Sequence, residues 1–214
     1  MGVTTVVFDV GETLVNEERH WGEWADWLGV PRFGFFAAMG AVIARGGHHR
    51  EVFQMVRPGV DIEAEQARRA AGGWRYRFEP GDFYADAFPC LAALRAAGYR
   101  IGIAGNQPEA AEAALEAADV RADFIASSAR WGVEKPSPAF FARVVEAASA
   151  PAAGIAYVGD RLDNDVLPAK AAGMMAIFIR RGPWGYVHAT LPDVAQASAR
   201  IESLDELIDI LRET

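Results

Sequence analysis

Several side chains that can do chemistry stand directly after apolar runs of this sequence. The run Val6-Val7-Phe8 predicts a buried strand and leads to Asp9, and three later apolar runs lead to polar segments in the same way. In an open α/β sheet, ligands bind in the crevice outside the carboxyl ends of the strands. The residues with this placement are Asp9, Gly105, Asn106, Lys135, Asp160 and Asp165. Carboxylates and a lysine gathered there predict a site for a divalent metal and a phosphate group.

Asp9 is the predicted nucleophile. A carboxylate in this place can attack phosphorus or an electrophilic carbon and form a covalent aspartyl intermediate. Aspartates at strand ends often do no more than cap the next turn, but the accompanying polar segments favour an active site. Lys135 precedes Pro136 and is therefore expected in extended backbone, from which its ammonium can clamp a phosphoryl oxygen.

The acids also predict a magnesium site. Mg²⁺ prefers oxygen ligands in octahedral geometry and usually keeps several waters, so one or two carboxylates suffice. We expect Asp9 and Asp160 to supply these carboxylates, with a backbone carbonyl near Gly11 as a third protein ligand. Asp165, or alternatively Asp163, would hold the metal waters or the lysine.

Short apolar runs alternate with helical stretches from residue 86 onward, which predicts a parallel sheet covered by helices on both faces. The capping box from Ser203 to Glu206 predicts the start of the last helix. The expected strands are 99–104, 124–127, 155–158 and 175–179, and the expected helices are 108–118, 138–148 and 165–172. The fold class is therefore α/β.

The segment that follows the first strand breaks this alternation. It contains Trp21, Trp24 and Trp27 at the spacing of a helix packing stripe, and a further helical stretch from Ile62 to Phe78. No convincing strand is present, so we expect a helical insertion placed over the mouth of the sheet. The predicted domains are an α/β core made of residues 1–15 and 84–214, and a helical cap made of residues 16–83.

The composition excludes several classes of protein. A net charge of −8 argues against general nucleic-acid binding, which depends on Lys and Arg, but it leaves small anionic substrates possible. We find no apolar stretch long enough to span a bilayer and no signal-peptide pattern, so no membrane association is expected. Cys90 is the single cysteine, which excludes an intrachain disulfide and suits a cytoplasmic location.

Four segments of the chain stand out together by their order and spacing. They are Asp9-Val10-Gly11-Glu12-Thr13-Leu14, Gly132-Val133-Glu134-Lys135-Pro136-Ser137-Pro138, Val158-Gly159-Asp160 with Asn164-Asp165-Val166, and Ala171-Ala172-Gly173-Met174. These segments resemble the haloacid dehalogenase (HAD) superfamily of hydrolases, in the subfamily whose helical cap follows the first strand. The resemblance covers nearly the whole chain and implies a Rossmann-like core, a mobile cap, Mg²⁺, an aspartyl-enzyme intermediate and, most often, phosphate-ester hydrolysis. We expect the first strand to lie between those at 99–104 and 155–158, which brings the segments together.

Two positions depart from the family pattern. Family phosphatases usually carry a second aspartate two residues after the nucleophile as the general acid, and this chain has Gly11 there. General acid–base catalysis contributes typically about 10²–10⁴-fold, so poor leaving groups should suffer most. Where the family usually has Ser or Thr, the chain has Gly105, so a phosphoryl oxygen would rely on the backbone N–H groups of Gly105 and Asn106. Glu12 is expected to point elsewhere.

Three functions stay open at this point. The favoured one is Mg²⁺-dependent hydrolysis of a small phosphorylated metabolite, with a preference for good leaving groups. The first alternative is dehalogenation of the 2-haloacid type, because halide leaves without a proton, although a dehalogenase has little need of a metal. The second is a catalytically degenerate member that binds a phosphorylated ligand without turnover. The substrate and the oligomeric state do not follow from the sequence.

The remaining conspicuous residues have less weight. Trp131 and Trp184 are expected on loops, where they would line the rim of the pocket. His48 and His49 form no metal-ligand pattern with the single cysteine, so a zinc site is not expected.

Overall fold

The computed structural model describes residues 2–213 and divides the chain into two compact units. The first unit comprises the residues up to Asn16 together with those from Phe78 onward, and the second is Glu17–Arg77. The second junction precedes the expected one because Phe78 and Phe83 pack against the core of the first unit. The role of the second unit as a cap stays a prediction.

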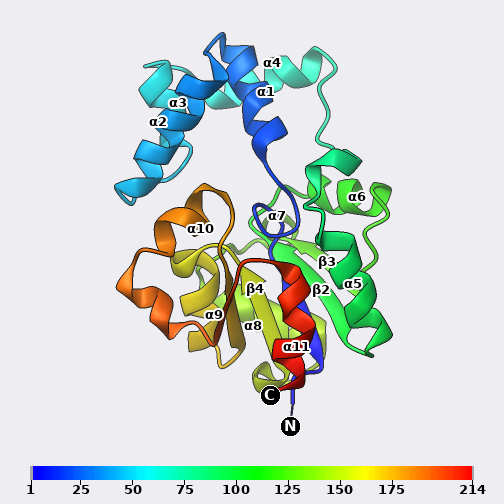
Figure 1. The fold of residues 1–214 in the computed structure, drawn as a ribbon. Helices are drawn as coiled ribbons and strands as arrows, with labels where there is room; N and C mark the ends of the chain where they lie inside the picture. Colours follow the sequence, from blue (N-terminus) through cyan, green and yellow to red (C-terminus); the bar gives the residue numbers. More distant parts are fainter. Residues whose placement is uncertain (1, 214) are drawn as a thin grey trace. The chain divides into compact units, whose positions relative to one another are not determined.

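The first unit is built on a six-stranded parallel sheet of order β3-β2-β1-β4-β5-β6 (Figure 1). As predicted, β1 pairs with β2 on one side and with β4 on the other, with Phe8 opposite Ile103 and Val158. This is the doubly wound α/β architecture expected from the alternation of strands and helices. The strands are β1 (Thr5–Phe8), β2 (Arg100–Gly105), β3 (Phe124–Ser127), β4 (Ile155–Gly159), β5 (Met175–Ile179) and β6 (Ala199–Ile201).

Helices connect these strands and cover the sheet. The longest helix of this unit is α8, which begins at Pro138. Ser137 is its N-cap, and the Ser137 hydroxyl accepts a hydrogen bond from the Ala139 N–H. The α-helices of the unit are α5 (Ala87–Ala96), α6 (Ala110–Ala117), α7 (Ser128–Trp131), α8 (Pro138–Ala148), α9 (Leu167–Ala171), α10 (Gly182–His188) and α11 (Leu207–Arg212). A π-helical turn spans Leu162–Val166, and 3₁₀ turns span Pro80–Asp82, Ala152–Gly154, Pro192–Gln196 and Leu204–Glu206.

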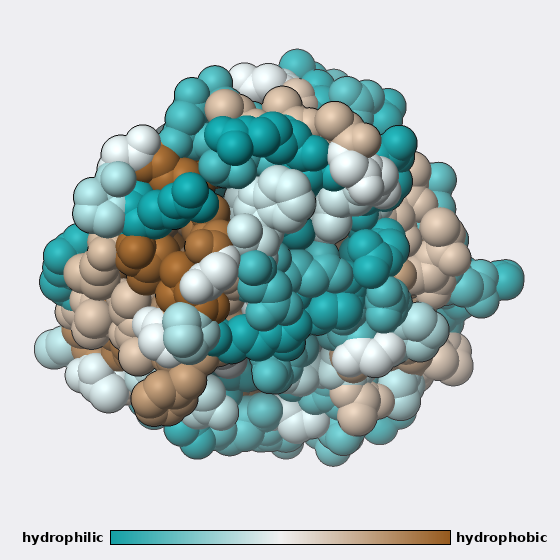
Figure 2. All heavy atoms as spheres, turned by 90° about the horizontal axis from the view of Figure 1, so that it is seen from above, coloured by the Kyte–Doolittle hydropathy of each residue, from teal (hydrophilic) through white to brown (hydrophobic). Residues whose placement is uncertain are grey.

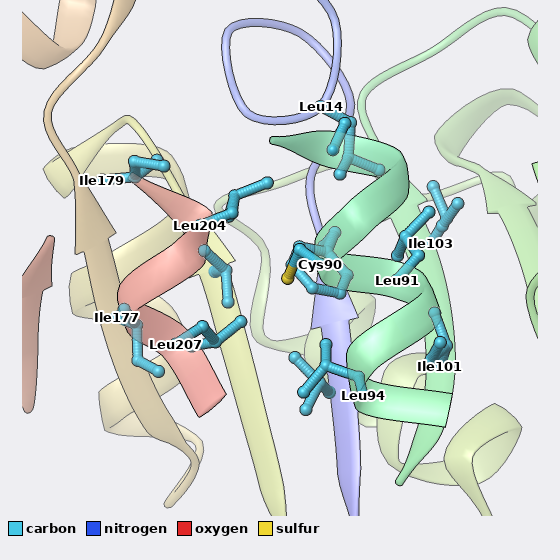
Figure 3. Close-up of a cluster of buried hydrophobic side chains, with 14 of the residues drawn as sticks. Leu14, Cys90, Leu91, Leu94, Ile101, Ile103, Ile177, Ile179, Leu204 and Leu207 are labelled. Carbon is cyan, nitrogen blue, oxygen red and sulfur yellow. The ribbon is translucent and has the colours of Figure 1, made fainter. Parts of the chain in front are cut away.

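Hydrophobic side chains cover both faces of the sheet, as a parallel sheet requires. On one face, Leu94 of α5 and Leu207 of α11 pack over the strands with Ile103 and Ile177 (Figure 3). On the other face, Phe141 of α8 packs with Tyr157 and its neighbours. Alternate residues of the strands β1, β2, β4 and β5 belong to opposite cores, as the alternating directions of side chains along a strand require.

Three local features differ from the sequence-based expectation. The strand Ala199–Ile201 was not expected, because three residues are too few to show an alternating pattern. Trp184 lies in α10 and Trp131 is the last residue of α7, so the prediction that both lie on loops was wrong. The glycines and prolines around them had suggested loops, but Pro183 occupies the first turn of its helix, where it is tolerated.

The second unit is helical, with an aromatic core of its own. Trp24 is buried against Phe53, with ring centroids 5.0 Å apart, and the Arg69 guanidinium lies 4.2 Å over the Trp24 ring. The helix expected over 62–78 ends at Ala71, because Gly73 adopts a positive φ of 95° that stops it. The helices are α1 (Glu18–Leu28), α2 (Arg32–Ala44), α3 (Glu51–Val56) and α4 (Ile62–Ala71).

The surface is mostly hydrophilic on the face drawn in Figure 2, where hydrophobic residues gather in one patch. Within residues 2–213, no single helix is both long and apolar enough to cross a membrane. The two consecutive helices α1 and α2 reach that length and composition only when taken together, across a bend of 114°.

Candidate active site

The carboxyl ends of three adjacent strands carry the predicted site residues. Asp9 follows β1, Gly105 ends β2, and Asp160 follows β4. Because β1 lies between β2 and β4, these residues meet at one edge of the sheet. Lys135 reaches the same place from the segment between α7 and α8. All of them belong to the first unit.

Lys135 joins two of the acids. Its Nζ lies 2.7 Å from Asp9 Oδ1 and 2.6 Å from Asp165 Oδ1, and the lysine is almost completely buried. Burial alone would lower the pKa of Lys135, but the attraction of Asp165 and Asp9 raises it well above its ordinary value. The ammonium is therefore charged at any physiological pH, as a clamp for a phosphoryl oxygen must be.

Asn106 holds the backbone of this lysine. Its side-chain Nδ2 donates to the Lys135 carbonyl at 2.9 Å, and the Lys135 N–H donates to Asn106 Oδ1 at 2.8 Å. The Asn106 side-chain amide, which directly follows β2, thus positions the backbone of Lys135. Donation by the Asn106 backbone N–H to a substrate oxygen stays a prediction.

Gly105 leaves room for the Asp9 side chain. A Cβ atom on this residue would lie 2.4 Å from Asp9 Oδ1, far inside van der Waals contact. Even the methyl group of alanine would therefore require the Asp9 carboxylate to turn away from the conformation that contacts Lys135. The glycine that replaces the usual family hydroxyl is therefore matched to the observed conformation of the Asp9 side chain.

The three aspartates form a compact acidic group. Asp9, Asp160 and Asp165 each offer a carboxylate oxygen, and these atoms lie within 4.8 Å of one another. Burial, followed by repulsion from Asp165 and Asp9, raises the pKa of Asp160 well above its usual range. Burial also raises the pKa of Asp165, to about 6, although the Lys135 ammonium opposes the shift.

The residues present fit a divalent cation. Asp160 Oδ2 is buried and has no hydrogen-bond partner in the described part of the chain, which is costly unless a ligand satisfies it. Three carboxylates face one ammonium, so ionising all of them leaves negative charge that a bound cation would offset. Asp9, Asp160 and the Gly11 carbonyl are the residues we expect to hold Mg²⁺.

Asp165 has a different set of partners from Asp160. Its Oδ1 accepts from the Lys135 ammonium, and its Oδ2 accepts from the Arg161 N–H at 3.0 Å. Asp163, the alternative for this role, instead forms a two-point pair with the Arg161 guanidinium and is half exposed. Of Asp163 and Asp165, it is therefore Asp165 that contacts the lysine.

Glu12 is buried near the site but faces Tyr84. Its Oε2 accepts a hydrogen bond from the Tyr84 hydroxyl at 2.5 Å, and its side chain occupies the space that a Cβ on Gly182 would need. The residue has a positive φ of 52°, which turns the loop after β1. This contact joins residues 72 apart in the chain, so no local pattern could have revealed it.

Comparison with known proteins places the chain in a family of hydrolases. The family model for haloacid dehalogenase-like hydrolases matches residues 3–173. The chain belongs to the haloacid dehalogenase-like hydrolase family. A relative from Methanopyrus kandleri, named glyceraldehyde 3-phosphate phosphatase, is 29% identical over 178 residues, which cover 78% of this chain and 74% of the relative.

Two solved structures of HAD enzymes share the fold. The HAD-hydrolase YfnB of Bacillus subtilis, solved with magnesium bound, has a TM-score of 0.71 at 18% identity over 99% of both chains. A 2-haloacid dehalogenase of Pseudomonas syringae has a TM-score of 0.57 at 24% identity over 99% of both chains. At these identities the likeness establishes the fold of this HAD hydrolase. It does not identify the substrate, which has to be argued from the residues of the site.

Proposed function

We propose that this HAD hydrolase is a Mg²⁺-dependent phosphatase that cleaves the phosphate monoester of a small metabolite. The observation that carries the proposal is the excess of acids at the site, above all the buried Asp160 Oδ2 that has no partner among residues 2–213. Dehalogenation has little need of such a metal site. The phosphatase name of the Methanopyrus kandleri relative supports the same class of reaction.

Asp9 is the nucleophile in this proposal. Its carboxylate oxygen forms a bond to phosphorus, the bond from phosphorus to the ester oxygen breaks, and the ester oxygen leaves with the electron pair as an alkoxide or aryloxide, which takes a proton from water. A water oxygen then bonds to phosphorus, the bond from phosphorus to the Asp9 oxygen breaks, and the proton of that water passes to solvent, which releases inorganic phosphate and restores the Asp9 carboxylate. When bound, Mg²⁺ would act as a Lewis acid toward the phosphoryl oxygens.

Lys135 stabilises the transferred phosphoryl group. In the observed structure its ammonium contacts Asp9 Oδ1, and this donor becomes available to a phosphoryl oxygen when the Asp9 oxygen binds phosphorus. Asp165 keeps Nζ in place throughout, because its contact with the lysine is independent of Asp9.

The proposal is tested with a panel of phosphate monoesters that includes glyceraldehyde 3-phosphate, assayed by release of inorganic phosphate. We expect turnover with Mg²⁺, loss of turnover in excess EDTA, and loss in Asp9→Asn. Hydrolysis that is unchanged in EDTA would contradict the metal requirement. Hydrolysis that persists in Asp9→Asn would contradict the role of Asp9.

Gly11 favours a second candidate function. A halide leaves without a proton, so the absence of a general acid costs little in dehalogenation. Halide release from 2-haloalkanoates in EDTA, without phosphate release from the ester panel, would establish that reaction instead. Binding of inorganic phosphate without turnover of either class would indicate a binding protein.

A cytoplasmic location stays a prediction.

A further inference from the structure

Tyr157 is a fully buried tyrosine that lies beneath the active site on the central strand β4. Its ring packs edge-on against Phe141, with centroids 5.4 Å apart, as an ordinary core residue would. A buried phenol needs a partner for its hydroxyl, and here that partner is a backbone carbonyl directly before Gly105. None of the roles assigned above uses this residue.

The Tyr157 hydroxyl connects two parts of the site. It donates to the Ala104 carbonyl at 2.8 Å, one residue before Gly105 at the end of β2. The Lys135 Nζ lies 5.7 Å from the centre of the Tyr157 ring, and its ammonium interacts with the hydroxyl. Burial raises the pKa of Tyr157 well above its usual range, so the hydroxyl stays a neutral group that both donates and accepts.

The contacts of the Lys135 ammonium show what the Tyr157 hydroxyl adds to the site. An ammonium has three N–H donors, and two of them are directed to Asp9 and Asp165. The third donor is available to the Tyr157 hydroxyl, with which the ammonium interacts. When Asp9 binds phosphorus, Asp165 and Tyr157 continue to orient the ammonium, and a displacement of about 1 Å can cost on the order of 10²-fold in rate.

We propose that Tyr157 is a positioning residue whose hydroxyl fixes the Lys135 ammonium relative to the end of β2. The phosphoryl group then meets the lysine and the Gly105 backbone at a constant separation. The inference rests on the proposed phosphatase function and assigns a role to a residue within the same site.

Tyr157→Phe tests the proposal, because phenylalanine keeps the ring and its contact with Phe141 and removes the hydroxyl. We expect kcat/KM for 4-nitrophenyl phosphate to fall by about 10- to 100-fold, the cost of losing one polar contact with a charged group. The affinity for inorganic phosphate should fall as well. Tyr99→Phe is the matched control, because its hydroxyl bonds the Leu211 carbonyl away from the site.

A double-mutant cycle separates positioning from simple packing. In a Lys135→Met background, Tyr157→Phe should change phosphate affinity by less than about 2-fold, because the group that it orients is gone. Equal losses in both backgrounds, or a single variant Tyr157→Phe with wild-type kcat/KM and phosphate affinity, would overturn the proposal. A wild type that hydrolyses no ester would refute the phosphatase function, and phosphate affinity alone would then decide the role of Tyr157.

Discussion

At the scale of single residues, Gly11 and Glu12 set the chemistry that the site can perform. Gly11 offers no side chain to protonate a leaving group, and the neighbouring Glu12 carboxylate is bonded to the Tyr84 hydroxyl. The departing oxygen must therefore carry its own charge or take a proton from water. The rate should depend on how well the leaving group bears that charge.

The first prediction follows from Gly11. Aryl and acyl phosphates should be hydrolysed well and alkyl phosphates poorly, and Gly11→Asp should improve alkyl esters selectively by up to about 10²–10⁴-fold. The measurement is kcat/KM against leaving-group pKa for wild type and variant. Equal wild-type rates on alkyl and aryl phosphates would show that another residue protonates the leaving group.

The second prediction concerns Asn106. Asn106→Ala removes both partners of the Lys135 backbone, and leaving such groups unsatisfied should lower the free energy of unfolding by about 1–3 kcal/mol. Because the lysine loses its backbone anchor, kcat should fall further than the stability loss explains at a temperature well below Tm. Urea unfolding and steady-state kinetics measure the two effects. A variant with wild-type kcat would show that Asp9 and Asp165 suffice to place Lys135.

At the scale of elements, β4 and the π-helical turn after it must approach closely. A Cβ on Gly159 would lie 2.4–2.6 Å from Asp165 Oδ2, Cγ and Cβ. The Asp165 side chain therefore packs directly against the backbone of Gly159 at the end of β4. This approach places Asp165 beside Lys135 and lets its Oδ2 accept from the Arg161 N–H. The π-helical turn supplies the unusual curvature, a feature that is frequent at functional sites.

The third prediction tests that approach. Gly159→Ala should lower the free energy of unfolding by about 1–3 kcal/mol through overpacking and should displace Asp165, which weakens turnover. Gly154→Ala is the matched control, because its Cβ would meet neighbours at 3.6–3.8 Å, which is ordinary contact. Thermal unfolding of both variants decides the matter. Equal stabilities of the two alanine variants would contradict the close approach.

At the scale of the whole molecule, the site links stability to pH and metal. The pKa values of Asp160 and Asp165 are raised in the folded protein by burial first, so folding favours their protonated forms. Without metal, this contribution is fully present below the ordinary pKa of 3.8 and is lost as the pH rises, through about 6 for Asp165. A bound cation requires the ionised acids and reverses the dependence.

The fourth prediction is that Mg²⁺ raises Tm, and more so as the pH increases from about 4 to 7. At 100 to 1,000 times its Kd, a ligand of the folded state adds about 3–4 kcal/mol, or about 5–15 °C for a protein of this size. Asp160→Asn should remove most of the shift and flatten the pH dependence of the metal-free protein. Thermal scans in EDTA and in Mg²⁺ across that pH range provide the measurement. A Tm unaffected by millimolar Mg²⁺ would count against the metal site.

The amino-acid sequence alone predicts the secondary-structure elements and the approximate place of the site. Each strand near the centre of the sheet is a short apolar run, and such runs alternating with helices allow few arrangements other than a parallel sheet. The carboxyl ends of parallel strands lie at one edge, so the order of the segments alone predicts that Asp9, Lys135 and Asp160 lie together. The short edge strand Ala199–Ile201 was not predicted, because three residues are too few to show an alternation of apolar and polar side chains.

The contacts between individual side chains of the site became known from the tertiary structure alone. The Asn106 amide on the Lys135 backbone joins residues 29 apart, and the Tyr157 hydroxyl on the Ala104 carbonyl joins residues 53 apart. Sequence spacing predicts the face of an element on which a residue lies, but a hydrogen bond depends on rotamers and on distances of a few tenths of an ångström. Those are fixed by packing between segments remote in the chain, and so Tyr157, a plain core residue in the sequence, became part of the site only in the fold.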